Sequence, residues 1–265
     1  MILDLLKAII LGAVEGITEF LPISSTGHLI IVNEWLKFDK HFTQMFDIVI
    51  QLGAIVAVAV YFKSRIFPFN QYANKKEVFE LWKKTLVAVL PALVIGFFLA
   101  KTIEANLFNP IVVAVALIVG GIALILLERR NVDHKINSIA ELSYKTAFVI
   151  GIIQCIAMVP GVSRSAATII GAMLLGASRV LAAEFSFFLA IPTIAAASAY
   201  SLLKNGLNMT GSEALVLLAG FTTSFLVAFA VIKMFMKYIQ TKNFIPFGYY
   251  RIILGALVLI YFWVK

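Results

Sequence analysis

The feature that most constrains this chain is a polar stretch at residues 15–28, EGITEFLPISSTGH, which interrupts an otherwise apolar run. KAIILGAV precedes it and LIIV follows it. An ionisable side chain surrounded by hydrocarbon costs about 2.5 kcal/mol or more, so it marks a functional site by default. Glu15 and Glu19 are four residues apart, which places both carboxylates on one face of a helix. A fold for this chain must therefore shelter these groups from lipid.

Pro22 predicts a break in the middle of this stretch, because proline donates no N–H and disfavours helix for the residue before it. We expect residues 24–27 to form a turn rich in hydroxyls and free amides, with His28 opening the next apolar run. A second polar stretch, PGVSRSAAT, lies far downstream at residues 160–168. We expect the fold to bring these two stretches together.

The composition indicates a polytopic membrane protein. Of 265 residues, 62% are hydrophobic and 14% are charged, against about 25% charged in a soluble domain. The net charge of +8 comes from Lys and Arg spread over loops. That spread favours positive-inside topology and contact with anionic headgroups over nucleic-acid binding. The single cysteine, Cys155, excludes an internal disulfide and a cysteine metal site.

The expected fold is all-α, with six transmembrane helices and two re-entrant helix–loop–helix hairpins. A helix needs ~20 apolar residues to span the hydrocarbon core. Two further apolar regions, 2–36 and 141–177, are too long for one span and are broken at prolines, so we interpret each as a re-entrant hairpin. Irregular backbone is tolerated at membrane depth where protein or a watery cavity surrounds it. The six expected spans are residues 46–62, 86–100, 107–127, 185–203, 214–232 and 247–264.

The order of these segments predicts a single membrane domain built from an inverted-topology repeat, with repeat one at 1–131 and repeat two at 141–265. Each repeat has one hairpin and three spans, and an odd number of spans inverts the second copy. At an offset of 139 residues Gly12 matches Gly151, Ser24 matches Ser163, and Glu15 faces Gln154. Such repeats place a site at the midplane, where broken helices meet.

Positive charge predicts the orientation. Loops 63–84, 129–145 and 233–242, with Arg179, hold most of the Lys and Arg residues. If these loops are cytoplasmic, both termini lie outside, and the 15–28 hairpin enters from the outer face.

Glu15 and Glu19 have the oxygen ligands that Mg²⁺ or Ca²⁺ prefers, and they also suit an acid/base pair. The alternative is a structural pair between helices, and Gly12 and Gly16 on the same helix would let another helix approach closely. Residues 24–28 offer backbone amides at a helix start, which is a ready anion site. A hydroxyl beside a histidine and a carboxylate also has the parts of an activated nucleophile. The alternative there is plain helix capping beside an interface histidine.

Arg164 lies between Ser163 and Ser165, directly after the Pro160–Gly161 break. Arginine is suited to phosphate because its planar guanidinium donates two parallel hydrogen bonds. The alternative is an arginine at a helix end that reaches the lipid headgroups. Asp47 and Gln51 lie one turn apart on an expected span and are candidates to support the site.

The two motifs, EGITEFLPISSTGH and PGVSRSAAT, resemble the signature segments of bacterial undecaprenyl-diphosphatases of the bacitracin-resistance type, and the resemblance covers the whole chain. It implies hydrolysis of undecaprenyl diphosphate to undecaprenyl phosphate and inorganic phosphate, which recycles the lipid carrier of cell-wall synthesis. It also implies a bacterial plasma-membrane enzyme. By this resemblance the functional positions are Glu15, Glu19, Ser25, His28 and Arg164, with Ser24, Thr26, Ser163 and Ser165 adjacent.

The mechanism expected from these residues is phosphoryl transfer, which depends on positioning and charge neutralisation. Glu19 and Glu15 hold a divalent cation, Mg or Ca, on the diphosphate. Ser25 attacks or positions water, His28 exchanges the proton, and Arg164 clamps the phosphate. Covalent seryl, histidyl and direct-water routes all stay open, and so does a different class, a transporter or flippase for a polyprenyl phosphate lipid. The expected partners are the lipid substrate and membrane lipid, with no nucleic acid and with a homodimer as the assembly to test.

Overall fold

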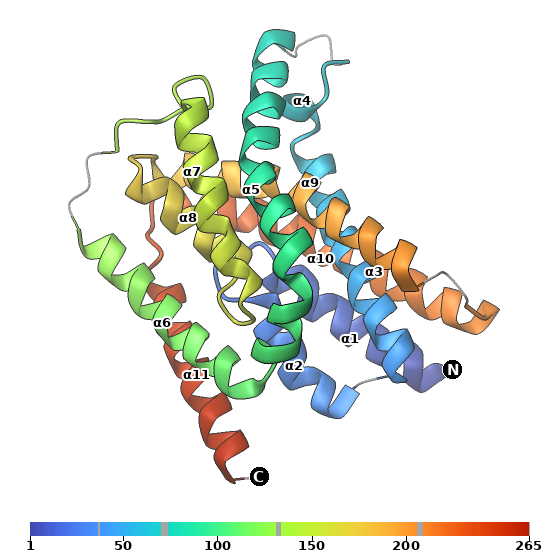
Figure 1. The fold of residues 1–265 in the computed structure, drawn as a ribbon. Helices are drawn as coiled ribbons and strands as arrows, with labels where there is room; N and C mark the ends of the chain where they lie inside the picture. Colours follow the sequence, from blue (N-terminus) through green and yellow to red (C-terminus); the bar gives the residue numbers. More distant parts are fainter. Residues whose placement is uncertain (37, 70–73, 131–133, 206–208, 265) are drawn as a thin grey trace.

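A computed structural model describes residues 1–36, 38–69, 74–130, 134–205 and 209–264, and Lys37 and the repeat boundaries at 131 and 265 lie outside these ranges. The described residues are helical, apart from turns, loops and one isolated β-bridge between Ile136 and Ala177 (Figure 1). The elements in chain order are α1 (Ile2–Thr18), α2 (Ser25–Leu36), α3 (Lys40–Tyr61), α4 (Lys63–Ile66), α5 (Lys75–Leu107), α6 (Pro110–Arg129), α7 (Tyr144–Gln154), the 3-10 turn η1 (Cys155–Met158), α8 (Arg164–Leu174), α9 (Arg179–Asn205), α10 (Gly211–Ile239) and α11 (Ile245–Val264).

Six of the described helices are long and apolar enough to cross a membrane, which confirms the expected all-α polytopic class. Most boundaries differ from the expected ones by seven residues or fewer, and the expected loop 233–242 is helical as far as Ile239, but the largest difference is at the start of α5. The segment 63–84 was expected to be irregular, but α5 already begins at Lys75, because Glu77, Glu80, Lys83 and Lys84 are good helix formers. Asn74 donates a hydrogen bond to the Glu77 carboxylate at that helix start. The six segments are Phe42–Tyr61, Lys75–Leu99, Pro110–Arg129, Arg179–Leu203, Gly211–Ile239 and Ile245–Val264.

The first hairpin breaks where the sequence predicts, although its details differ. Helix α1 ends at Thr18, four residues before Pro22, and α2 begins at Ser25. The expected turn over residues 24–27 is therefore wrong in part, since three of those residues form the first turn of α2. The reason is a cap: the Ser24 hydroxyl accepts a hydrogen bond from the Gly27 N–H at 3.3 Å.

The second hairpin repeats this local geometry. Helix α7 gives way to η1, the chain turns at Gly161, and α8 begins directly after Ser163. Ser24 and Ser163, 139 residues apart, both have a φ of 73°, and they are the non-glycine residues with positive φ in the described chain. That match and the equal order of helices favour the internal repeat. Entry of the two hairpins from opposite membrane faces stays a prediction.

The two halves of the chain that were expected to be repeats are intertwined. Helix α1 packs along α10, whereas α7 packs along α5, so the first helix of each hairpin lies against the other repeat. Helices α6 and α11 pair along one side of the bundle (Figure 1). The expected close approach at Gly12 is confirmed, because a Cβ there would lie 2.5 Å from the Gly220 carbonyl oxygen of α10. Gly151 of α7 meets the Ala88 backbone of α5 in the same manner.

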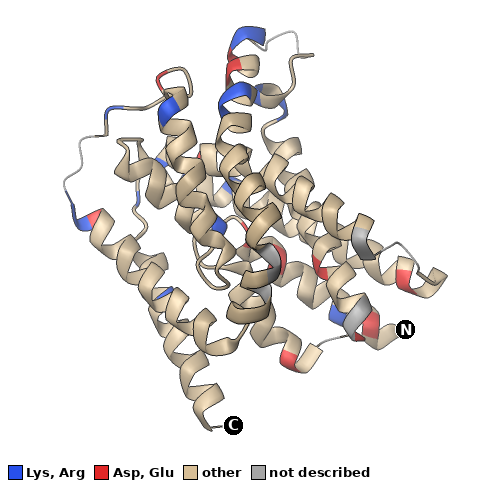
Figure 2. Ribbon diagram, viewed as in Figure 1, with Lys and Arg blue, Asp and Glu red and all other residues tan. Residues whose placement is uncertain are grey.

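The Lys and Arg residues gather at one end of the bundle, around α4, the start of α5 and the start of α7, at the top of Figure 2. Both chain termini lie at the opposite end. This distribution matches the arrangement expected from the loops. The orientation in a membrane stays a prediction.

Candidate active site

The Glu19 carboxylate makes contacts with both hairpins. Glu19 follows the end of α1, and its Oε2 accepts a hydrogen bond from the Ser25 hydroxyl at 2.6 Å. Its Oε1 accepts a hydrogen bond from Arg164 Nη2 at 3.2 Å, across 145 residues of sequence. The Glu19 side chain is 8% exposed and that of Arg164 is 11% exposed. The structure therefore brings the two sequence motifs into direct contact, as expected.

Arg164 is held from a second side by α9. Its Nη1 donates to the Ser186 carbonyl oxygen at 2.9 Å and lies 3.3 Å from the Ser186 hydroxyl. Thr168 donates its hydroxyl proton to the Ser186 hydroxyl at 2.7 Å, and the guanidinium lies 5.8 Å from the centre of the Phe20 ring. The guanidinium is thus fixed between a carboxylate and a hydroxyl. Sequence reasoning missed Ser186, because nothing marks one serine in an apolar helix.

Two helix N-termini converge at this ion pair. Ser24 caps α2, and the Ser163 hydroxyl accepts a hydrogen bond from the Ala166 N–H at the start of α8. Both capping serines have the left-handed backbone conformation, which costs about 1–3 kcal/mol in a residue other than glycine. Free amides at a helix start carry partial positive charge and favour an anion.

These groups line a cavity of about 200 Å³, which we call the polar cavity. Seven residues of the expected site line it: Glu19, Ser24, Ser25, Thr26, Gln51, Ser163 and Arg164. Sequence reasoning had not placed Gln154 and Thr193 in the site, and both line it. The rest of the lining is mostly small or apolar, from α5, η1 and α9. The cavity is therefore lined by one charged pair, Glu19 and Arg164, by polar side chains and by small or apolar residues.

Two expected site residues lie behind this lining. Glu15 is fully buried, and neither carboxylate oxygen has a hydrogen-bond partner among the described residues. Glu19, Asp47 and Arg164 are the charged residues that act electrostatically on the Glu15 carboxylate. Ser165 is also fully buried and donates its hydroxyl proton to the Leu21 carbonyl oxygen at 2.7 Å. Ser165 thus ties α8 to the first hairpin.

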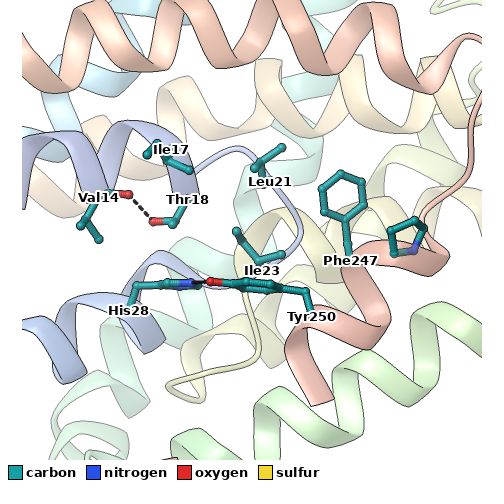
Figure 3. A pocket seen from close by; sticks show the side chains of 9 residues that line it. Val14, Ile17, Thr18, Leu21, Ile23, His28, Phe247 and Tyr250 are labelled. Atoms are coloured by element: carbon teal, nitrogen blue, oxygen red, sulfur yellow. Dashed lines mark hydrogen bonds between the residues drawn. The ribbon is translucent and has the colours of Figure 1, made fainter. Parts of the chain in front are cut away.

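His28 faces a different cavity. Its ring lines an apolar space of about 470 Å³ between α1 and α11, with Tyr250 and Phe247 (Figure 3). One ring nitrogen, Nδ1, lies 2.7 Å from the Ser24 carbonyl oxygen, and Nε2 lies 2.6 Å from the Tyr250 hydroxyl. The His28 and Tyr250 rings are nearly parallel, with an interplanar angle of 6°. His28 therefore reaches the polar cavity only through the backbone of Ser24.

A fully buried arginine, Arg251, donates hydrogen bonds to the backbone at both helix breaks. Arg251 of α11 has no exposed surface, and its guanidinium donates to the carbonyl oxygens of Pro22 at 3.2 Å and Gly161 at 3.0 Å. It also donates to Leu117 and Ala116 of α6. One side chain thereby satisfies carbonyls in both hairpins. The sequence shows an arginine in an apolar segment but does not reveal this function.

The donor set fits one type of divalent cation better than another. Within the described ranges, no group of three or more His, Cys, Asp or Glu side chains could hold a metal by protein ligands alone. Ca²⁺ takes 6–8 oxygen ligands, whereas Mg²⁺ is commonly held by one or two carboxylates plus substrate phosphates and water. The unpartnered, buried oxygens of Glu15, beside Glu19, fit the second pattern.

The fold and the site define a class: an all-α, multi-pass membrane protein with an arginine, a carboxylate and two helix N-termini around a polar cavity. Comparison with known proteins gives the family. A model of the family described as bacitracin resistance protein BacA matches residues 8–257, and the chain belongs to this family.

Curated relatives match over nearly their whole length. Undecaprenyl-diphosphatase 1 of Clostridioides difficile (strain 630) is 52% identical to this chain over 266 residues, which cover 98% of this chain and 97% of the relative. Undecaprenyl-diphosphatase of Enterococcus faecalis is 48% identical over 267 residues, with 97% of each chain covered. The resemblance stated from the two motifs is confirmed.

Proposed function

We propose that this chain is an integral membrane phosphatase that hydrolyses undecaprenyl diphosphate to undecaprenyl phosphate and inorganic phosphate. Membership of the family and the names of its curated relatives support this activity. The observation that carries it in the structure is the bridging position of Glu19, between a hydroxyl and a guanidinium. A nucleophile (Ser25), its base (Glu19) and a phosphate-binding guanidinium (Arg164) then lie together in one cavity.

The terminal phosphate of the substrate binds between Arg164 and the starts of α2 and α8. Arginine and the free amides at both helix starts neutralise charge on the equatorial oxygens, which is the main source of catalysis in phosphoryl transfer. Thr26, Gln51 and Ser163 line the same cavity and contribute further hydrogen bonds. The prenyl chain of the bound substrate extends out of the cavity along the apolar residues of its lining.

Ser25 is the attacking group. Its hydroxyl already donates to Glu19 Oε2 at 2.6 Å, so Glu19 takes the proton as Ser25 Oγ bonds to the terminal phosphorus. The bond from that phosphorus to the bridging oxygen breaks, and the lipid monophosphate leaves. Water then hydrolyses the phosphoserine. Proton exchange by His28 stays a prediction; in the structure its ring contacts the Ser24 carbonyl oxygen, beside Ser25, and the Tyr250 hydroxyl.

Glu15 and Glu19 are the residues that would hold a divalent cation, of which Mg²⁺ fits this donor set better than Ca²⁺. When bound, such a cation neutralises charge on the diphosphate. Glu15 has oxygens free for this purpose, whereas Glu19 is shared with Ser25 and Arg164.

Phosphate release from the purified protein, reconstituted in lipid with undecaprenyl diphosphate, tests this function. Glu19→Gln removes the proton acceptor and should reduce release at least 100-fold. Glu80→Gln, at a partly exposed carboxylate outside the polar cavity that pairs with Lys83 and Tyr144, is the matched control and should leave release unchanged. A transporter or flippase, the alternative for an intertwined repeat fold, would release no phosphate in the wild-type protein.

The site opens to the outer face of the bacterial plasma membrane, since the basic end of the bundle belongs on the cytoplasmic side (Figure 2). In a Cys155→Ser background, Asn106→Cys should react in intact cells with a membrane-impermeant maleimide. Lys75→Cys, at the basic end, should react only after the cells are permeabilised. The opposite labelling pattern would place the site on the cytoplasmic side.

A further inference from the structure

Gln154 is a buried amide without a partner. It is the last residue of α7, is 3% exposed, and lines the polar cavity. Neither its Nε2 nor its Oε1 has a hydrogen-bond partner among the residues that the structure describes. Folded proteins rarely leave a buried amide without hydrogen bonds, so an unpartnered amide that faces a cavity indicates a ligand-binding group.

The neighbours of Gln154 indicate which part of a ligand it meets. Ala157 and Met158 of η1, three and four residues after Gln154, line the cavity with apolar surface, as do Ala92 of α5 and Ile194 of α9. The charged lining comes instead from Glu19 and Arg164. The Gln154 amide makes no hydrogen bond with either charged residue, so it faces the cavity apart from the Glu19–Arg164 pair.

The internal repeat supplies an independent comparison. Glu15 lies nine residues before Ser24, and Gln154 lies nine residues before Ser163, where Ser24 and Ser163 are the two capping serines with φ of 73°. Both side chains are buried at the same point of their hairpins, and both lack hydrogen-bond partners. A carboxylate at position 154 would repel a phosphate, whereas an amide N–H donates to one. Glu15 is thus suited to bind a cation, and Gln154 is suited to bind an anion.

We propose that the Gln154 amide N–H donates to a non-bridging oxygen of the lipid-linked phosphate, the one that stays on the product. This inference rests on the proposed function. Arg164 holds the terminal phosphate, and Gln154 holds the phosphate next to the prenyl chain, where the lining changes from charged to apolar. Gln154 therefore binds both the substrate and the lipid monophosphate, but it does not bind released inorganic phosphate.

Product inhibition of the reconstituted enzyme separates the two phosphate positions. Gln154→Leu removes the donor at similar length, and it should raise both KM and the inhibition constant of undecaprenyl phosphate about tenfold. The value of kcat should change less than threefold, and inhibition by inorganic phosphate should stay within twofold of wild type. Gln240→Leu, an exposed glutamine at the end of α10, is the matched control and should change none of these values.

Two further variants keep the test decisive if Gln154→Leu does not fold. Gln154→Glu has the same size, and it should weaken inhibition by undecaprenyl phosphate more than Gln154→Leu does. Arg164→Lys should show the opposite selectivity and weaken inhibition by inorganic phosphate. An unchanged inhibition constant for undecaprenyl phosphate in both Gln154 variants would overturn the inference. Absence of hydrolysis in the wild-type protein would refute the proposed function instead, and direct binding of undecaprenyl phosphate to the variants would still test Gln154.

Discussion

Replacement of Arg164 by lysine tests the charge arrangement of the site, because it keeps the positive charge and removes the planar fork. The Arg164 guanidinium reaches in two directions, to Glu19 Oε1 at 3.2 Å through Nη2 and to the Ser186 carbonyl oxygen at 2.9 Å through Nη1. A lysine side chain is shorter and carries its charge on one nitrogen, so it cannot hydrogen-bond to both partners at once. At least one charge-assisted hydrogen bond within the protein is therefore lost.

The size of the effect follows from these contacts. A hydrogen bond to a charged group contributes about 1.5–3 kcal/mol, and each ~1.4 kcal/mol changes a rate about tenfold. Loss of one such bond to Ser186 or Glu19 predicts a decrease of about 10- to 100-fold in kcat/KM. Loss of the bidentate bond to phosphate adds a similar factor. We expect Arg164→Lys to lower kcat/KM at least 100-fold.

The assay is phosphate release by the reconstituted protein as a function of undecaprenyl diphosphate concentration. The matched control is Arg65→Lys, because Arg65 also pairs with a glutamate, Glu184, but its side chain is 45% exposed and lies outside the polar cavity. The control should stay within twofold of wild type. A kcat/KM for Arg164→Lys within threefold of wild type would mean that Arg164 only anchors its helix.

Two further predictions concern the buried charges. Glu15→Gln should weaken dependence on added Mg²⁺ and lower activity. Glu19→Gln should lower activity further, because it also changes the contacts to Ser25 and to Arg164. Full activity of the wild-type protein in EDTA would exclude the cation site. Arg251→Leu leaves the Pro22 and Gly161 carbonyls in the two breaks without this donor, each costing about 1–3 kcal/mol, and removes second hydrogen bonds to Ala116 and Leu117 of α6, so its Tm in detergent should drop strongly. Gly120→Ala, whose Cβ would overlap the Arg251 guanidinium, should lower Tm as well, and an unchanged Tm in both variants would contradict the role given to Arg251.

The sequence predicted the helical architecture well, because apolar length and prolines are strong local signals in membrane proteins. It misplaced the start of α5 by eleven residues, at 86 instead of 75, since polar helix formers beyond the membrane give no hydropathy signal. It also treated Ser25 as part of a turn. The cap at Ser24, which lets the helix start one residue later, depends on a backbone conformation that composition does not reveal.

The site was predictable in its members but not in its contacts. Seven of the expected residues line one cavity, because chemistry inside a membrane requires residue types that are rare there. Which ones touch depends on how two distant hairpins meet. No local pattern shows that Ser25 donates to Glu19 and that His28 instead meets Tyr250 of α11. Gln154 and Ser186 were missed for the same reason.

The most direct test of the central claim, that both hairpins form one catalytic site, is a double-mutant cycle in kcat/KM for Ser25→Ala and Arg164→Lys. Ser25 belongs to the first hairpin and Arg164 to the second, and both bind the Glu19 carboxylate. Residues that act as a unit show strongly non-additive losses. We expect the double variant to be no more than threefold less active than Ser25→Ala alone. Losses that multiply in full would contradict a shared site.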